Sequence, residues 1–132
     1  MGLPGGRREQ DDTDLLATAV RETREEIALS LDPRRLLGTL DDLTPRTPTL
    51  PPVLIRPFVF GLKERPSAET SAEVAACFWV PLEALGSAQA TASVMIQGKS
   101  VSVPCFEIAD LPQGCVVWGL TYRILLGLLP KF

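Results

Sequence analysis

The feature that most constrains the fold is a regular stripe of side chains in the segment 13–29. Its members recur at intervals of three and four residues, at Leu16, Val20, Thr23 and Ile27. That spacing puts them on one face of an α-helix, and such a face has to be buried against another layer. The spacing therefore predicts a helix over 13–29 with Asp12 or Thr13 as its N-cap.

Three apolar segments that follow predict strands. The first, at 34–42, is a short strand leading into a polar turn, and the second, "VLIRPFVFGL" at 53–62, is the strongest strand candidate. Pro57 denies that second strand one ladder hydrogen bond and indicates a bulge or an edge. The third, "VAACFWVPL" at 74–82, predicts a buried strand that stops at Pro81 and is followed by a helical turn.

Loops, a hairpin and a second helix complete the predicted order of elements. Four prolines in 44–52 and the polar stretch 63–73 indicate loops. Residues 92–108 alternate around Gln97-Gly98-Lys99, a pattern typical of a β-hairpin. The apolar segment from Val116 onward predicts a helix that docks on the sheet.

The chain has 132 residues, of which 45% are hydrophobic. This is enough for one compact domain with a core and too little to expect two. Strands flanked by helices at both ends then indicate an α/β or α+β sandwich. We expect a single domain over 1–132.

Charge and hydropathy exclude several classes of function. The net charge is −3, so no basic field is available to bind a nucleic-acid backbone. No apolar run reaches the roughly 18 residues that span a bilayer, and the first residues lack the features of a signal peptide. We expect a soluble, cytoplasmic protein that binds neither nucleic acid nor membrane.

Cysteine and histidine usage restricts the chemistry further. The three cysteines are Cys77, Cys105 and Cys115; the first two lie in apolar, strand-like runs, which favours buried thiols over a disulfide framework. The chain contains no histidine, which removes the usual general base and the commonest transition-metal ligand. Any chemistry must therefore rest on carboxylates, hydroxyls, arginines or a hard cation.

Three carboxylates gather at the end of the predicted helix. Glu22, Glu25 and Glu26 stand at i, i+3 and i+4 and share one face, where each like-charge pair costs a few tenths of a kcal/mol. Carboxylates in the last turn also oppose the helix dipole by ~0.3 to 1 kcal/mol each. One interpretation is a solvated face on which Arg21 pairs with Glu25 and Arg24 screens the others. The other is a site for a cation.

The segment in front of this helix favours the second interpretation. Gly5 and Gly6, in "LPGGRREQDD", allow backbone groups to approach a ligand closely. Together, residues 2–29 resemble the Nudix box, Gly-x5-Glu-x7-Arg-Glu-U-x-Glu-Glu-x-Gly-U with U a bulky apolar residue. The Arg21-Glu22-x-x-Glu25-Glu26 core matches fully, over a box that we place at 5–29.

The details of the match are similar to the coenzyme A pyrophosphatase branch of that family. One residue more than the general pattern lies between Gly6 and Arg21, and "PGGRREQDDTD" resembles the variant of that branch. Later segments, such as "VLIRPFVFGL" and "SAEVAACFWVPLEAL", are also similar to it. The resemblance implies a Nudix-type α/β/α sandwich around a mixed sheet.

The resemblance also implies a metal site and a reaction. By position, Glu22, Glu25 and Glu26 would bind Mg²⁺ or Mn²⁺ together with the carbonyl of Gly5, and Arg21 would orient the glutamates. Hard cations of this kind prefer such oxygen ligands. The reaction would be hydrolysis of a diphosphate, with metal-bound water as the attacking group and Glu25 and Arg21 among the catalytic residues.

Residues outside the core of the box supply the remaining candidates. The arginines and aromatic residues among them are more simply explained as ordinary surface or core residues, whereas for Glu73 the catalytic role and a solvated loop position are equally good explanations. The candidates for binding the anionic substrate are Arg7, Arg8 and Arg56. The family often places a general base on a loop before a tryptophan-bearing strand, and the candidates for it are Glu73 and then Glu69. The candidates for stacking on an adenine are Trp118 and Tyr122.

The sequence departs from the family pattern in three places. Ala28 replaces the box glycine, which costs strain if that position has a positive φ, and Thr23 occupies an apolar position. The box also begins close to Met1, so we expect the domain to lack its N-terminal strands. Because a sheet without them exposes an edge, we expect 53–62 or a neighbouring strand to pair with a second copy in a homodimer.

Two functional hypotheses follow. The first is a metal-dependent Nudix hydrolase acting on the diphosphate of coenzyme A or of a related small nucleoside diphosphate derivative. The second is a catalytically inactive Nudix-fold binding or regulatory module. The intact Glu22, Glu25 and Glu26 favour the enzyme, and the short N-terminus favours the module.

Overall fold

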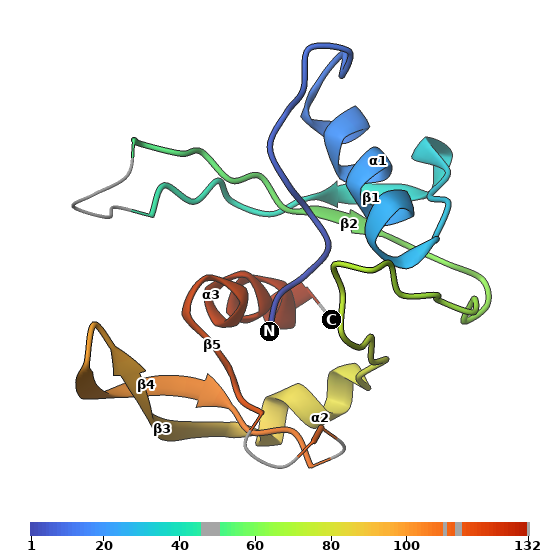
Figure 1. Ribbon diagram of the computed structural model, residues 1–132. Helices are drawn as coiled ribbons and strands as arrows, with labels where there is room; N and C mark the ends of the chain where they lie inside the picture. The colour runs from blue at the N-terminus through green and yellow to red at the C-terminus, as the bar shows by residue number, and fades with distance from the viewer. Residues whose placement is uncertain (46–50, 110, 113–114, 132) are drawn as a thin grey trace. The chain divides into compact units, whose positions relative to one another are not determined.

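A computed structural model describes residues 1–45, 51–109, 111–112 and 115–131 (Figure 1). The chain divides into two compact units. The first, which we call the N-terminal unit, is Pro4–Cys77, and the second, the C-terminal unit, is Phe78–Phe132 together with Met1–Leu3. The expectation of one domain over the whole chain stays a prediction.

The first helix, α1, spans Leu15–Ile27 and confirms the helix predicted from the stripe. Asp14 is its N-cap, and its carboxylate accepts a hydrogen bond of 2.8 Å from the amide of Ala17. The prediction of Asp12 or Thr13 as the cap was therefore wrong. Of the stripe, Thr23 and Ile27 are buried, while the other two members are half-buried.

The helix ends at a left-handed residue. Ala28 has φ 56° and ψ 25°, and its amide donates to the carbonyl of Arg24 at 3.0 Å. This conformation favours glycine because a Cβ crowds the backbone there. The strain expected from alanine at this position is confirmed.

Two strands complete the regular structure of the N-terminal unit, after a short 3₁₀ turn at Pro33–Arg35. β1, Leu36–Thr39, pairs antiparallel with β2, Phe58–Phe60, and the register shifts by a bulge within β1. The strand predicted at 53–62 is therefore much shorter than expected. Pro57 has no amide to donate, and upstream of it the described residues continue the pairing as an isolated bridge between Leu43 and Ile55.

The loop predictions for this unit are tested in part. Residues 63–73 form an irregular segment, as predicted. Of the proline-rich segment 44–52, residues 46–50 lie outside the described residues, and the four flanking positions are neither helix nor strand. β2 pairs with β1, and the homodimer stays a prediction.

The C-terminal unit contains the predicted hairpin. β3, Gln89–Ile96, and β4, Lys99–Phe106, pair in register, and β5, Val117–Trp118, adds to β4. The turn residues Gln97 and Gly98 have φ 50° and 76°. Positive φ at both central positions suits the twist of a two-residue hairpin.

Two helices accompany this sheet in the C-terminal unit (Figure 1). α2, Leu82–Ser87, confirms the predicted helical turn, and α3, Gly119–Leu128, confirms the second helix and continues into a 3₁₀ turn at Leu129–Lys131. The start of that helix was placed too early, because Val117 and Trp118 pair with β4 as a strand.

The core of the C-terminal unit forms around Phe106, which is fully buried. Leu85, Ile108, Leu111 and Val117 surround it, and Tyr122 of α3 packs on its ring with a centroid distance of 4.8 Å. Tyr122 is thus a core residue. Trp118 remains 37% exposed.

The prediction of a buried strand at 74–82 is wrong. Residues 74–80 belong to no strand, and Cys77, Phe78 and Trp79 are exposed. An apolar run becomes a strand only where a neighbouring strand takes its backbone hydrogen bonds, and within the described residues none does. The burial predicted for Cys77 fails for the same reason, whereas Cys105 is buried, and all three cysteines are free thiols.

The α/β class is confirmed. The described strands, however, form two antiparallel sheets, one in each unit, and not one mixed sheet. No helix in the described part of the chain is long and apolar enough to cross a membrane.

Candidate active site

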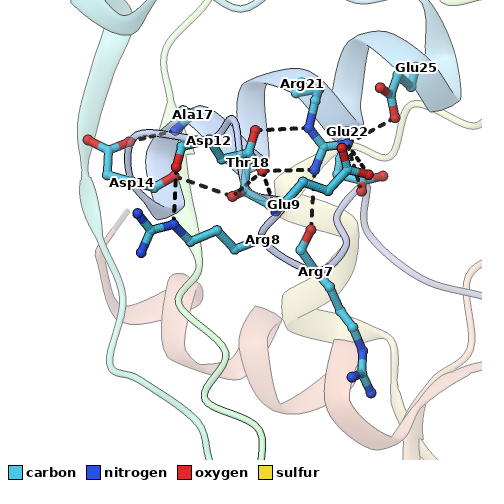
Figure 2. Close-up of polar contacts among 10 residues, drawn as sticks. All are labelled: Arg7, Arg8, Glu9, Asp12, Asp14, Ala17, Thr18, Arg21, Glu22 and Glu25. Carbon is cyan, nitrogen blue, oxygen red and sulfur yellow. Dashed lines mark hydrogen bonds and ion pairs between the residues drawn. The ribbon is translucent and has the colours of Figure 1, made fainter.

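Arg21 fastens the glycine-rich segment to α1. Its Nη2 donates to Asp12 Oδ2 at 2.9 Å and to the carbonyl of Arg7 at 3.2 Å, and its Nε donates to Asp12 Oδ1 at 3.0 Å (Figure 2). The side chain of Arg21 is only 20% exposed and that of Asp12 only 5%. One guanidinium therefore fixes two points of the segment that precedes the helix.

Asp12 has further partners. Its Oδ2 accepts from the amide of Glu9 at 2.8 Å and from the hydroxyl of Thr18 at 2.9 Å. These donors, Arg21 first, hold the pKa of Asp12 well below its usual value. The sequence pattern indicates Asp12 only as a helix cap, because its nine-residue separation from Arg21 crosses the start of the helix and matches no helical spacing.

Arg21 also contacts the acidic face of the helix. Its Nη1 lies 3.1 Å from Glu22 Oε1, 3.1 Å from Glu25 Oε2 and 3.6 Å from Glu9 Oε1 (Figure 2). Asp12 first, and then Glu22 and Glu9, raise the pKa of Arg21. The pairing of Arg21 with Glu25 that the solvated-face interpretation expected is therefore present. It is part of a larger network.

Gly6 packs directly on the carboxylate of Glu22. A Cβ at Gly6 would overlap the Cδ and Oε1 atoms of Glu22, whereas a Cβ at Gly5 would meet nothing within 4 Å. The two adjacent glycines thus have different roles. Gly6 is the position where the backbone contacts Glu22, a candidate metal-binding residue.

Glu22 and Glu26 form a pair of carboxylates beside Gly5. Partial burial first, then the charges of Glu22 and Glu73 and a hydrogen bond with Glu22, raise the pKa of Glu26, and the amide of Gly5 opposes this rise. Glu26 therefore lies close to Glu22 and to the glycine turn. The structure brings together three predicted site residues, Glu22, Glu26 and Gly5, and the charge of the predicted base Glu73 acts on Glu26.

The loop that carries Glu73 is tied to the end of α1. The amide of Glu69 donates to the carbonyl of Ile27 at 3.0 Å, and the amide of Ser71 donates to the carbonyl of Glu26 at 2.9 Å. These bonds use carbonyls that the helix leaves unpaired at its end. They hold the loop that carries Glu73 against the end of α1, where the charge of Glu73 acts on Glu26.

The candidate substrate-binding arginines differ in their surroundings. Arg8 donates to the carbonyls of Asp12 and Thr13 at 3.2 and 3.0 Å. Arg56 forms two parallel 2.9 Å bonds with Asp42 and lowers the pKa of that carboxyl. For the guanidinium of Arg7 the described residues provide no hydrogen bond and no ion pair.

The donor set suits a hard divalent cation in its chemistry, because carboxylates and a backbone carbonyl are the ligands that such ions take. The neighbouring carboxylates of Glu22 and Glu26 form a ready pair. Glu25 is 55% exposed and bound to Arg21, so it would have to turn away from the arginine to join them. Within the described residues no three acidic or cysteine side chains converge closely enough to enclose an ion.

Residues 1–100 match the family model of the NUDIX domain. The chain is 32% identical over 133 residues to Nudix hydrolase 15, mitochondrial, of Arabidopsis thaliana, and 36% identical over 76 residues to mitochondrial coenzyme A diphosphatase NUDT8 of Mus musculus. These alignments cover 96% and 56% of the chain, but only 45% and 36% of the respective relatives.

A third relative is an uncharacterized protein of Schizosaccharomyces pombe. It is 37% identical over 87 residues, which are 62% of the chain and 26% of that protein. The chain thus spans less than half the length of each of these relatives.

Proposed function

The chain belongs to the Nudix family, and from that premise we propose that it is a divalent-metal-dependent hydrolase that cleaves a diphosphate. The substrate that we propose is coenzyme A or a related small nucleoside diphosphate derivative. For coenzyme A the products would be phosphopantetheine and adenosine 3′,5′-bisphosphate.

The observation that carries this proposal is the pair of carboxylates, Glu22 and Glu26, that the helix holds against the glycine turn, where Gly6 packs on Glu22 and the amide of Gly5 faces Glu26. Burial first, and then the like charges of Glu22 and Glu73, raise the pKa of Glu26, so holding this carboxylate ionised in the folded state costs free energy. A purely structural helix gains nothing from such an arrangement. A group of carboxylates that is neutralised when a cation binds accounts for it, and perturbed carboxylates of this kind mark functional sites.

Each residue has a proposed role. Glu22, Glu25, Glu26 and the carbonyl of Gly5 would hold Mg²⁺ or Mn²⁺, which supplies charge neutralisation of the diphosphate and a water of lowered pKa. Arg21 positions Glu22 and Glu25 by ion pairing. Glu73 would accept a proton from the attacking water, as a general base next to the carboxylate pair.

Support for coenzyme A comes from two sides. The segment from Gly5 to Asp14 resembles the coenzyme A pyrophosphatase branch, and one relative is named a coenzyme A diphosphatase. The alignment with that relative covers only 36% of its length. Other nucleoside diphosphate derivatives therefore have to be tested as substrates too. Cytoplasmic localisation stays a prediction, and two relatives are named as mitochondrial proteins.

A second candidate function is a Nudix-fold binding module without hydrolytic activity. It is favoured by the pairing of Glu25 with Arg21 and by the lack, within the described residues, of three converging metal-binding side chains. Such a module would bind a diphosphate without turning it over.

Incubation with Mg²⁺ or Mn²⁺ and a panel of coenzyme A, ADP-ribose, NADH and diadenosine polyphosphates separates the two functions. The hydrolase should release the product of diphosphate cleavage from at least one of them, and Glu26→Gln should abolish that release. Glu83→Gln, an exposed glutamate in α2, is the matched control and should retain it. Binding without turnover by the wild type would favour the module, and full turnover by Glu26→Gln would show that the site is misplaced.

A further inference from the structure

We propose that the guanidinium of Arg7 binds a phosphate group of the substrate at the edge of the carboxylate site. This inference rests on the proposed function, since it concerns a ligand that carries a diphosphate. The sequence does not distinguish Arg7 from Arg8 and Arg56 as candidates for binding the substrate. The structure does, because it gives the guanidinium groups of Arg8 and Arg56 other partners.

The backbone of Arg7 is held next to the site. Its carbonyl accepts a 3.2 Å hydrogen bond from Nη2 of Arg21, whose Nη1 contacts Glu22 and Glu25. Arg7 also follows Gly6, which packs on the carboxylate of Glu22. The Cα of Arg7 is therefore fixed close to the candidate ligands.

The side chain of Arg7, in contrast, is available. It is exposed and extends away from the drawn carboxylates (Figure 2), and the described residues offer its guanidinium neither a hydrogen bond nor an ion pair. An unpaired arginine is unexpected in this part of the sequence, because Glu9, Asp11 and Asp12 follow within five positions. A charged group left without a partner beside so many carboxylates is available for a mobile anion.

Arg21 and the other two candidate substrate-binding arginines are already engaged. Arg21 is surrounded by carboxylates, Arg8 donates to two backbone carbonyls, and Arg56 is paired with Asp42. A diphosphate approaching the glutamates meets a strongly negative surface, and a cation reduces that repulsion. The planar fork of a guanidinium also suits the oxygen geometry of phosphate.

Binding of ADP in the presence of Mg²⁺, measured by titration calorimetry, tests this proposal without relying on turnover. Arg7→Gln should weaken ADP binding about 10-fold, which is the loss of one charge-assisted contact. Arg7→Lys keeps the charge and loses the planar, two-pronged donor geometry of the guanidinium. Its affinity for ADP should lie between those of wild type and Arg7→Gln. Added salt should narrow the difference between wild type and Arg7→Gln, because an exposed charge is screened.

Arg24→Gln is the matched control, because Arg24 is also exposed, lies in the same unit and has no side-chain partner among the described residues. It should bind ADP within about 2-fold of wild type. Arg7→Gln should unfold at the wild-type temperature, since only the backbone of Arg7 is hydrogen-bonded. Equal ADP affinity of Arg7→Gln and wild type, or no ADP binding by the wild type, would overturn the proposal.

The outcome is separable from that of the proposed function. Weaker ADP binding by Arg7→Gln supports the role of Arg7 even if the substrate panel shows no turnover. Absence of turnover would contradict only the proposed hydrolase activity. If turnover is present, Arg7→Gln should raise KM about 10-fold and change kcat little, because it removes binding that substrate and transition state share. A fall in kcat with unchanged KM would contradict it.

Discussion

Gly6 lies so close to Glu22 that the space a Cβ would fill at Gly6 is taken by the Glu22 carboxylate. The contact joins the glycine-rich segment to the acidic face of α1 at the point where Glu22 also meets Arg21. The position of this carboxylate is therefore set from two sides, by an absent side chain and by an ion pair.

Gly6→Ala is predicted to displace Glu22 and to lower diphosphate hydrolysis about 10²-fold, because small misplacements of a catalytic group have effects of this size. The glutamate is the far end of a flexible side chain, so the fold should survive. Steady-state kinetics with the substrate found in the panel gives the measurement.

Gly5→Ala is the control for that substitution. A Cβ at Gly5 meets nothing within 4 Å, and Ala keeps both the amide that faces Glu26 and the carbonyl. Its activity should stay within about 3-fold of wild type, on the same scale of positioning effects. Equal losses in the two variants would show that the Gly6 contact has no special role.

The Asp12–Arg21 pair predicts a dependence of stability on acid. The pKa of Asp12 is lowered in the folded state, so between the folded and the unfolded pKa the unfolded chain binds more protons. The contribution is fully present above the unfolded pKa of about 4 and is lost as pH falls toward the folded pKa. Urea unfolding of wild type and Asp12→Asn between pH 2 and 7 measures it.

Asp12→Asn should be less stable at neutral pH, and its deficit should shrink as the pH falls. A deficit that is the same at every pH would mean that the charge of Asp12 adds nothing beyond its hydrogen bonds.

Ala28→Gly is predicted to stabilise the protein. Alanine in the left-handed region costs about 1 to 2 kcal/mol, and the greater freedom of glycine in the unfolded chain offsets about 0.4 to 1 kcal/mol of the gain. The free energy of unfolding should thus rise, by at most about 1.6 kcal/mol. Ala19→Gly, inside α1, should lower it by about 1 kcal/mol, and a loss of stability in both variants would contradict the role of φ at position 28.

The sequence predicted the structure correctly where the contacts that determine it are local. The periodicity of 13–29 predicted α1, and Gln97-Gly98 predicted the hairpin, because both depend on neighbours in the chain. The prediction failed at 74–82, where strand formation depends on a partner strand elsewhere, and it overestimated 53–62, where pairing across Pro57 shrinks to a bridge.

The candidate site shows the same division. Glu22 and Glu26 could be placed on one helix face from their spacing alone, whereas the docking of the Glu73 loop on the end of α1 needed the bonds from Ser71 to Glu26 and from Glu69 to Ile27. Asp12 was missed because its partnership with Arg21 joins a loop to a helix, and no periodicity describes that.

Manganese binding tests the central claim most directly. Titration of Mn²⁺ followed by electron paramagnetic resonance, with wild type, Glu22→Gln, Glu26→Gln and the exposed control Glu83→Gln, reports on the carboxylates without any substrate. We predict that wild type and Glu83→Gln bind Mn²⁺ alike and that each of the other two variants binds it at least about 10-fold more weakly. Wild-type affinity in both Glu22→Gln and Glu26→Gln would contradict the account.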